Sequence, residues 1–175
     1  MSRFATNKNL LRVSKAKKSE IDRWKEGRAL ESSSGRTIEE LSHRVVADRL
    51  QLAMRFLRVG DRLHAGAQPD YRLAVSRYYY AMYHAMRAAA YFSHGGDDHE
   101  EHSKLPSNAP TDLPNSALLS NSLKDARERR NAADYNPYPK GNGAWKRHAA
   151  NLSVDAAKLV QEVRQYLRAK GCRYI

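Results

Sequence analysis

The chain has 175 residues and a formal net charge of +12, with 31 Lys and Arg against 19 Asp and Glu. This length predicts one main domain. The surplus of positive charge favours an anionic partner, above all nucleic acid, and the alternative is a basic surface that only aids solubility. The single cysteine, Cys172, excludes a disulfide framework, and no apolar run is long enough to span a membrane, so we expect a cytoplasmic protein that contacts no membrane.

Residues 1–36 form a distinct basic segment. They contain ten Lys and Arg and four Asp and Glu, which is half of the net charge. The stretch KKSEIDRWKEGRAL is compatible with a short helix, and ESSSGRT ends it because serine and glycine compete with helix. We interpret 1–36 as a basic N-terminal arm with one short helix, and the alternative is a flexible tail. Residues 37–175 form the main domain.

The main domain shows apolar residues at spacings of three and four, which is typical of helices. Thr37 and Glu40 predict a capping box at the start of the first helix, and the Gly/Pro segment HAGAQPDY ends it. Further helices are predicted over about 70–94, 116–135 and 143–169, without any strand or Gly-rich phosphate loop. The prediction is an all-α protein, an antiparallel four-helix bundle with an additional N-terminal helix or arm.

Residues 95–115 contain two glycines and three prolines, and we expect a loop without regular structure. The loop begins near HGGDDHEEH, which carries side chains that metals favour: His94, Asp97, Asp98, His99 and His102. The HEEH run lacks the His-Glu-x-x-His spacing of zinc proteases. We therefore favour a solvated polar loop over a metal site, and predict neither a metal nor a cofactor.

The helix over 70–94 combines two faces. One face is a stripe of alanine, tyrosine and methionine that predicts core packing. The other is a basic-aromatic stripe: Arg77, Tyr80, His84, Arg87 and Tyr91. Aromatic side chains interleaved with arginine suit single-stranded RNA, so Arg77, Tyr80 and Arg87 are predicted RNA contacts. The alternative is that the tyrosines pack between helices with their hydroxyls at the rim.

The stretch RERRNAADYNPY ends the helix over 116–135 with an arginine cluster. Helical phase places Arg130 on the packing face, flanked by Arg127 and Arg129. An unpaired buried guanidinium is costly, so Asp134, four residues on, is a predicted structural ion-pair partner. Two functions remain open for Arg130: this ion pair alone, or bidentate binding of an RNA phosphate with Arg127 and Arg129 as further RNA contacts.

The stretches SRYYYAMYHAMRAA and RNAADY, in this order, resemble the HEPN domain of small bacterial and archaeal proteins, over about residues 40–168. The matching residues are Ser76, Arg77, Tyr79, Tyr80, Tyr83, Arg130, Ala133, Asp134 and Tyr135. The resemblance implies a helical bundle that forms a homodimer. It also implies one of two functions: a metal-independent endoribonuclease of a toxin–antitoxin, CRISPR or anti-phage system, or a non-catalytic module. The second would bind RNA, a nucleotidyltransferase or a larger defence complex.

The resemblance also identifies a gap in the motif. Active HEPN domains carry Arg, a polar residue, and His four to six positions later. Here Arg130 and Asn131 are followed by Tyr135 where the histidine is expected, and tyrosine is a poor base at neutral pH. The predicted catalytic set is Arg130, Asn131 and Tyr135, with His84 as a substitute base if its face meets Arg130. In the non-catalytic alternative, Tyr135 or Tyr138 is a target for modification.

Overall fold

The computed structural model describes residues 3–138 and 141–175, and these contain helices and no β-strand. The prediction of an all-α fold is therefore confirmed. The chain divides into two compact units, residues 1–41 and 42–175. Across the described residues, no helix combines the length and the apolar composition that crossing a bilayer requires.

The first unit contains two helices, α1 (Arg3–Ser14) and α2 (Lys18–Ser34), where we predicted a single short one. The backbone N–H of Lys17 donates to the Glu20 carboxylate and caps the start of α2. Gly35 ends α2 in the left-handed conformation, with φ of 65°, which glycine adopts without strain. None of the α2 residues is buried, so local capping rather than a core stabilises this helix.

The third helix, α3 (Ile38–Ala65), begins with the predicted capping box. The backbone N–H of Thr37 donates to the Glu40 carboxylate, and the backbone N–H of Glu40 donates to the Thr37 hydroxyl, both at 3.1 Å. The capping-box prediction is confirmed.

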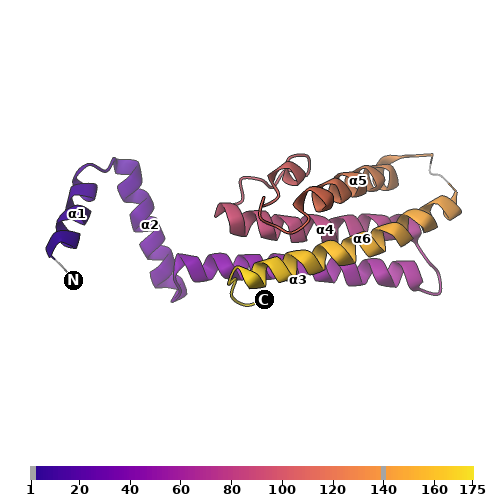
Figure 1. The fold of residues 1–175 in the computed structure, drawn as a ribbon, viewed down its shortest axis with the longest axis horizontal. Helices are drawn as coiled ribbons and strands as arrows, with labels where there is room; N and C mark the ends of the chain where they lie inside the picture. Colours follow the sequence, from indigo (N-terminus) through magenta and orange to yellow (C-terminus); the bar gives the residue numbers. More distant parts are fainter. Residues whose placement is uncertain (1–2, 139–140) are drawn as a thin grey trace. The chain divides into compact units, whose positions relative to one another are not determined.

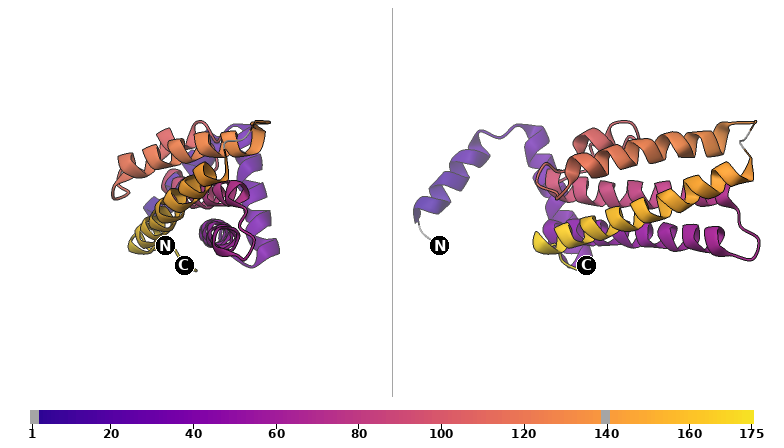
Figure 2. Two further views of the ribbon diagram at one scale, coloured as in Figure 1. Left: turned by 90° about the vertical axis from the view of Figure 1, so that its right-hand side faces the viewer. Right: turned by 45° about the vertical axis from the view of Figure 1, so that its right-hand side comes forward.

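The second unit is a bundle of α3 from residue 42, α4 (Tyr71–His94), α5 (Ser116–Tyr135) and α6 (Asn142–Ala169). Figures 1 and 2 show that consecutive helices run in opposite directions, with α4 packed against α5 and α6. The predicted helix boundaries agree closely with these. Small side chains on α4 let its neighbours approach, and Ala74, Ala81, Ala85 and Ala89 are fully buried.

Gly60 allows α3 to pack closely on α4. A Cβ atom at this position would lie 2.7 Å from Cε1 of Tyr78, which is too close for any larger side chain. The Tyr78 hydroxyl donates a 3.0 Å hydrogen bond to Asp61. Gly60 thus remains inside the helix because the close approach to Tyr78 outweighs its low helix propensity.

Residues 95–115 contain a short 3-10 helix, η1 (Leu105–Asn108), so the expectation of a segment without regular structure was wrong here. The reason is apolar anchoring, since η1 packs against α4 and α5. Leu105 is fully buried and Leu113 nearly so. The segment is therefore fixed at its middle and end, rather than being free along its whole length.

Candidate functional site

Arg130 lies at the centre of a polar cluster between α5 and α4. Its Nε atom is 2.7 Å from Oδ2 of Asp134, Nη1 donates to Oδ1 of Asn131 at 3.1 Å, and Nη2 donates to the Tyr80 hydroxyl. The Ser76 hydroxyl donates to the other Asp134 oxygen. Asp134 therefore joins α4 to α5, and Asn131 and Tyr80 fix the plane of the guanidinium.

Three tyrosine rings surround this guanidinium. Its central carbon is 5.2 Å from the ring centroids of Tyr80 and Tyr135 and 5.8 Å from that of Tyr79. The Arg130 side chain keeps 15% of its surface exposed. Cation–π contacts of this kind hold a charged group at the edge of a core without neutralising it.

The guanidinium keeps hydrogen-bonding capacity after these contacts are counted. Among the described residues, Nη1 and Nη2 of Arg130 each use one of their two N–H groups, so two donors remain. The Nε–H group lies against Asp134 as an ion pair but does not point at an acceptor. The cluster can therefore offer Arg130 to a small anion such as a phosphate at its exposed edge.

Arg72 fixes the last turn of α5, which carries the candidate site. Its guanidinium donates to the backbone oxygens of Ala133 and Asn136. These carbonyls have no partner within the helix, so Arg72 supplies donors that a helix end otherwise lacks. Arg72 and Ser76, one turn apart on α4, together position the Asp134 end of α5, and our sequence analysis missed both contacts.

Arg87 anchors the segment that follows α4. Its Nε donates to Asp97 at 2.8 Å, its Nη2 contacts Glu100 at 2.9 Å, and Arg49 from α3 also contacts Asp97 at 2.8 Å. The hydrogen bond from Arg87 in particular lowers the pKa of Asp97 to about 2. Arg87, which we predicted to contact RNA, is thus engaged by carboxylates and holds residues 97–100 on α4.

His102 is brought to the same aromatic cluster by this anchored segment. Its ring stacks on Tyr83 with centroids 4.0 Å apart, and its Nδ1 is hydrogen-bonded to the Tyr79 hydroxyl. Burial by the rings, then the charges of Arg130 and Arg127, lower the pKa of His102. From the sequence pattern we expected His102 to be only a loop residue, with a metal ligand as the alternative. One sequence signal could have predicted this position of His102. Acidic residues lie beside it in the sequence, and they can pair with the arginines of the preceding helix.

His84, our candidate substitute base, lies beside Tyr80, with ring centroids 6.4 Å apart. Its ring stacks on Phe56 at 5.3 Å and meets Tyr83 edge-on at 5.0 Å. Burial, followed by the charges of Arg87 and Arg49, lowers the pKa of His84 to about 4. His84 is therefore neutral at pH 7, and Tyr80 contacts both His84 and Arg130.

The three other arginines that we predicted to contact RNA, Arg127, Arg129 and Arg77, lie in three different parts of the bundle. The charge of Arg127 acts on Tyr79 and His102, so it belongs to the Arg130 cluster. Arg129 instead lines a hollow of about 220 Å³ with Trp145 and His148 of α6. Arg77 lies over Phe56 and lines an apolar groove of about 330 Å³ between α3 and α4.

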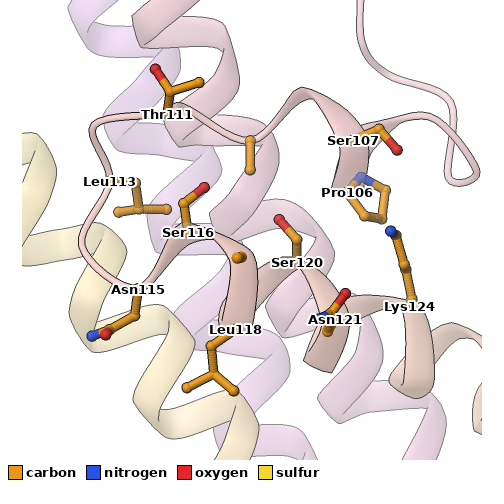
Figure 3. A pocket seen from close by; sticks show the side chains of 12 residues that line it. Pro106, Ser107, Thr111, Leu113, Asn115, Ser116, Leu118, Ser120, Asn121 and Lys124 are labelled. Atoms are coloured by element: carbon orange, nitrogen blue, oxygen red, sulfur yellow. The ribbon is translucent and has the colours of Figure 1, made fainter.

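A second hollow, of about 820 Å³, lies between η1 and the start of α5 (Figure 3). Its lining is mostly hydroxyl, amide and apolar side chains, with Lys124 as its one charged residue. It contains none of the predicted site residues. Among the described residues, no group of three or more His, Cys, Asp or Glu is arranged to hold a metal ion.

The family model of the HEPN domain matches residues 46–169. The chain belongs to the HEPN domain family. The match contains the Arg130 cluster, the anchored segment and all of α4, α5 and η1, while the N-terminal arm lies outside it. No curated protein matches the chain. Membership makes this HEPN domain a module of the ribonuclease, RNA-binding or defence-associated kind.

Proposed function

We propose that this HEPN domain binds RNA and that Arg130 is its principal phosphate ligand. The observation that carries the proposal is the Arg130 guanidinium, which Tyr80 and Asn131 fix but leave with two N–H donors, on a side chain that keeps 15% of its surface exposed. A planar guanidinium with free donors suits a phosphate oxygen pair. Tyr135, which is 70% exposed beside it, offers a ring on which a nucleobase can stack.

The positive charge of the chain supports an RNA phosphate, rather than a protein carboxylate, as the anion that Arg130 binds. Arg127 adds a second positive group beside Arg130, and the N-terminal arm contributes six of the twelve net charges. A single-stranded RNA presents many phosphates, so a basic chain of this kind gains affinity by releasing counterions. Arg87 does not take part, because Asp97 and Glu100 already neutralise it.

Cleavage of RNA is a separate question from binding. Attack by the 2′-hydroxyl requires a group that accepts its proton near neutral pH. A phenol is a poor base at neutral pH, and His84 has a pKa of about 4, so neither Tyr135 nor His84 is matched to this task. Binding is accordingly the function that we propose, and metal-independent cleavage is measured as a further property.

The test is incubation of the purified full chain with total RNA and tRNA in EDTA, beside a filter-binding assay at moderate salt. We expect binding by the natural protein and loss of binding in Arg130→Ala. Cleavage that persists in EDTA and disappears in Arg130→Ala would extend the proposal to a ribonuclease. Absence of RNA binding by the natural protein at moderate salt would contradict it.

We also infer that two copies associate, since HEPN domains usually dimerise and a paired site would offer two arginine clusters to one RNA. Sedimentation of the full chain is expected to give a dimer. Cysteine cross-linking near Tyr135 is expected to join the two copies. A dimer in which the two Arg130 clusters lie far from the twofold axis would count against a shared RNA site.

The second candidate is a non-catalytic partner of a nucleotidyltransferase or of a larger defence complex. The observation that favours it is the exposure of two tyrosines at the end of α5, with Tyr135 at 70% and Tyr138 at 86%. Exposed phenols next to a positive cluster are accessible to a nucleotide-transferring partner. Retention of all function after Tyr135→Phe and Tyr138→Phe would exclude modification of these hydroxyls.

A further inference from the structure

Two features of the Arg130 cluster remain unexplained by phosphate binding through arginine alone. One is the network that holds the segment after α4, in which Asp97 takes hydrogen bonds from both Arg87 and Arg49. The other is the hydrogen bond from the Tyr83 hydroxyl to the backbone oxygen of Glu100. Both fix the residues immediately before His102, so the network sets the position of the His102 ring.

The His102 ring lies against the same tyrosines as Arg130. Tyr79 is hydrogen-bonded to His102 Nδ1, and its ring centroid is 5.8 Å from the Arg130 guanidinium. The Tyr80 ring meets His102 edge-on at 6.2 Å, and its hydroxyl accepts from Arg130. The residue is exposed to solvent while its ring is partly desolvated by the tyrosines.

We propose that His102 is a second phosphate ligand of the Arg130 site and that it binds the phosphate in its protonated form. This inference rests on the proposed RNA binding. Nδ1 is hydrogen-bonded to the Tyr79 hydroxyl, and we assign to the neutral ring the tautomer in which this hydroxyl donates to Nδ1 and the hydrogen of the ring is on Nε2. When a proton from solvent is taken up, both ring nitrogens become donors, and the Tyr79 hydroxyl oxygen accepts from Nδ1–H instead. Nε2 carries a hydrogen in both forms and donates it to the phosphate oxygen, and the proton taken up at Nδ1 adds the positive charge that strengthens this hydrogen bond.

The charges around His102 determine the direction of this effect. The charged and titratable groups near it come from its own segment and from both packed helices: Glu100, Glu101, Lys104, Tyr79, Tyr80, Tyr83, His84, Arg87, Arg127 and Arg130. Burial and then the arginine charges lower the His102 pKa, so the ring is neutral at pH 7 in the free protein. A phosphate held by Arg130 offsets those charges and raises the pKa, so binding takes up a proton. RNA affinity must therefore increase as the pH falls.

The test measures RNA affinity as a function of pH in four full-length proteins: the natural protein, His102→Gln, His99→Gln and Arg130→Ala. The probe is a fluorescein-labelled oligouridylate of about ten nucleotides. It carries 2′-O-methyl groups, so that it cannot be cleaved through a 2′-hydroxyl. The natural protein is expected to bind about tenfold more tightly near pH 6 than near pH 8, which corresponds to a pKa raised by roughly one and a half to two units on binding, because the full effect of a shift is reached only below both pKa values. His102→Gln is expected to abolish this dependence. His99→Gln, in the same segment but with its ring edge-on to His94, is the matched control and is expected to keep it.

A second measurement needs no variant. In the natural protein labelled with ¹⁵N, the imidazole resonances of His102 are expected to show a neutral ring at pH 7 and a protonated ring after addition of the same oligonucleotide. An unchanged pH dependence in His102→Gln, or a ring that stays neutral when RNA binds, would overturn the inference. If Arg130→Ala then still loses affinity, the proposed function survives. If the natural protein binds no RNA at any pH, the proposed function fails.

Discussion

Two arginines contact tyrosines of α4, and their surroundings differ in one respect. Arg87 is engaged by two carboxylates, Asp97 and Glu100, and its guanidinium lies 5.9 Å from the Tyr83 ring. Arg130 has one carboxylate, Asp134, and its other protein contacts are to neutral groups. The exposed fractions of the two side chains are similar, at 19% and 15%.

Exposure alone therefore does not distinguish an arginine that holds a segment in place from one that we propose to bind RNA. Arg87 donates hydrogen bonds to two carboxylates and so holds a segment in place. Arg130 keeps two N–H donors, and its neighbours offset its positive charge only in part. The comparison predicts that changes around Arg87 act first on stability, and that changes around Arg130 act first on RNA affinity.

The largest effect on stability is expected from Asp97→Ala. This change removes the shared partner of Arg87 and Arg49 and leaves two partly buried guanidinium groups without it. We expect the free energy of unfolding to fall by about 2 kcal/mol, because a broken ion pair costs more than its formation contributes. Urea denaturation measures it. The neighbouring Asp98 is exposed, so an equal loss in Asp98→Ala would contradict the account.

The same carboxylate predicts a pH dependence of stability. The hydrogen bond from Arg87 lowers the folded-state pKa of Asp97 to about 2 from an ordinary value of 3.8. A depressed pKa contributes stability that is fully present above the unfolded value and is lost as the pH falls from about 4 toward 2. Denaturation midpoints across this range should fall more steeply in the natural protein than in Asp97→Asn. Parallel curves would show that Asp97 does not contribute.

Asp134→Asn tests the prediction for Arg130, whose carboxylate partner it removes. The amide can still accept from Ser76, but it no longer offsets the charge of Arg130. We expect stability to fall by about 1 kcal/mol and RNA affinity to rise about threefold, since a negative charge near the phosphate is removed. Fluorescence anisotropy with labelled RNA measures the affinity. A large loss of affinity would mean that Asp134 positions Arg130 rather than competing with RNA.

The smallest effect is expected from the N-terminal arm. Replacing Lys15 and Lys17 with glutamine removes two positive charges from a unit that lies outside the HEPN match. We expect the slope of log affinity against log salt to decrease by about 1.4 at most, with little change near physiological salt. An affinity loss as large as that of Arg130→Ala would move the RNA site from the bundle to the arm.

Much of the fold followed from the sequence because helical periodicity and caps are local signals. The four helices of the bundle, the Thr37 capping box and the i, i+4 pairing of Arg130 with Asp134 all depend on neighbours within one or two turns. The arm was less well predicted. Its two helices lack an apolar stripe, so periodicity gave no boundary between them.

The parts of the site that sequence missed are contacts between distant segments. Arg72 reaches the end of α5 across 61 residues of sequence, and Ser76 reaches Asp134 across 58. His102 sits in a Gly- and Pro-rich segment, where spacing carries no information about direction. Its hydrogen bond to Tyr79 depends on the ion pair between Asp97 and Arg87, which holds the segment in place. From residue type alone, Asp97 looks like a possible metal ligand. Such contacts need the folded chain.

A comparison of RNA affinity between Arg130→Ala and Arg129→Ala tests directly whether Arg130 binds the RNA phosphate. The two changes remove the same charge from adjacent residues, but Arg129 lies beside Trp145 and His148 rather than in the tyrosine cluster. We predict that Arg130→Ala weakens binding by at least about 30-fold, the loss of about 2 kcal/mol of charge-assisted hydrogen bonding, and that Arg129→Ala changes it by less than about threefold. Equal losses in the two variants would contradict the account, because they would show that net charge, and not the Arg130 site, determines RNA binding.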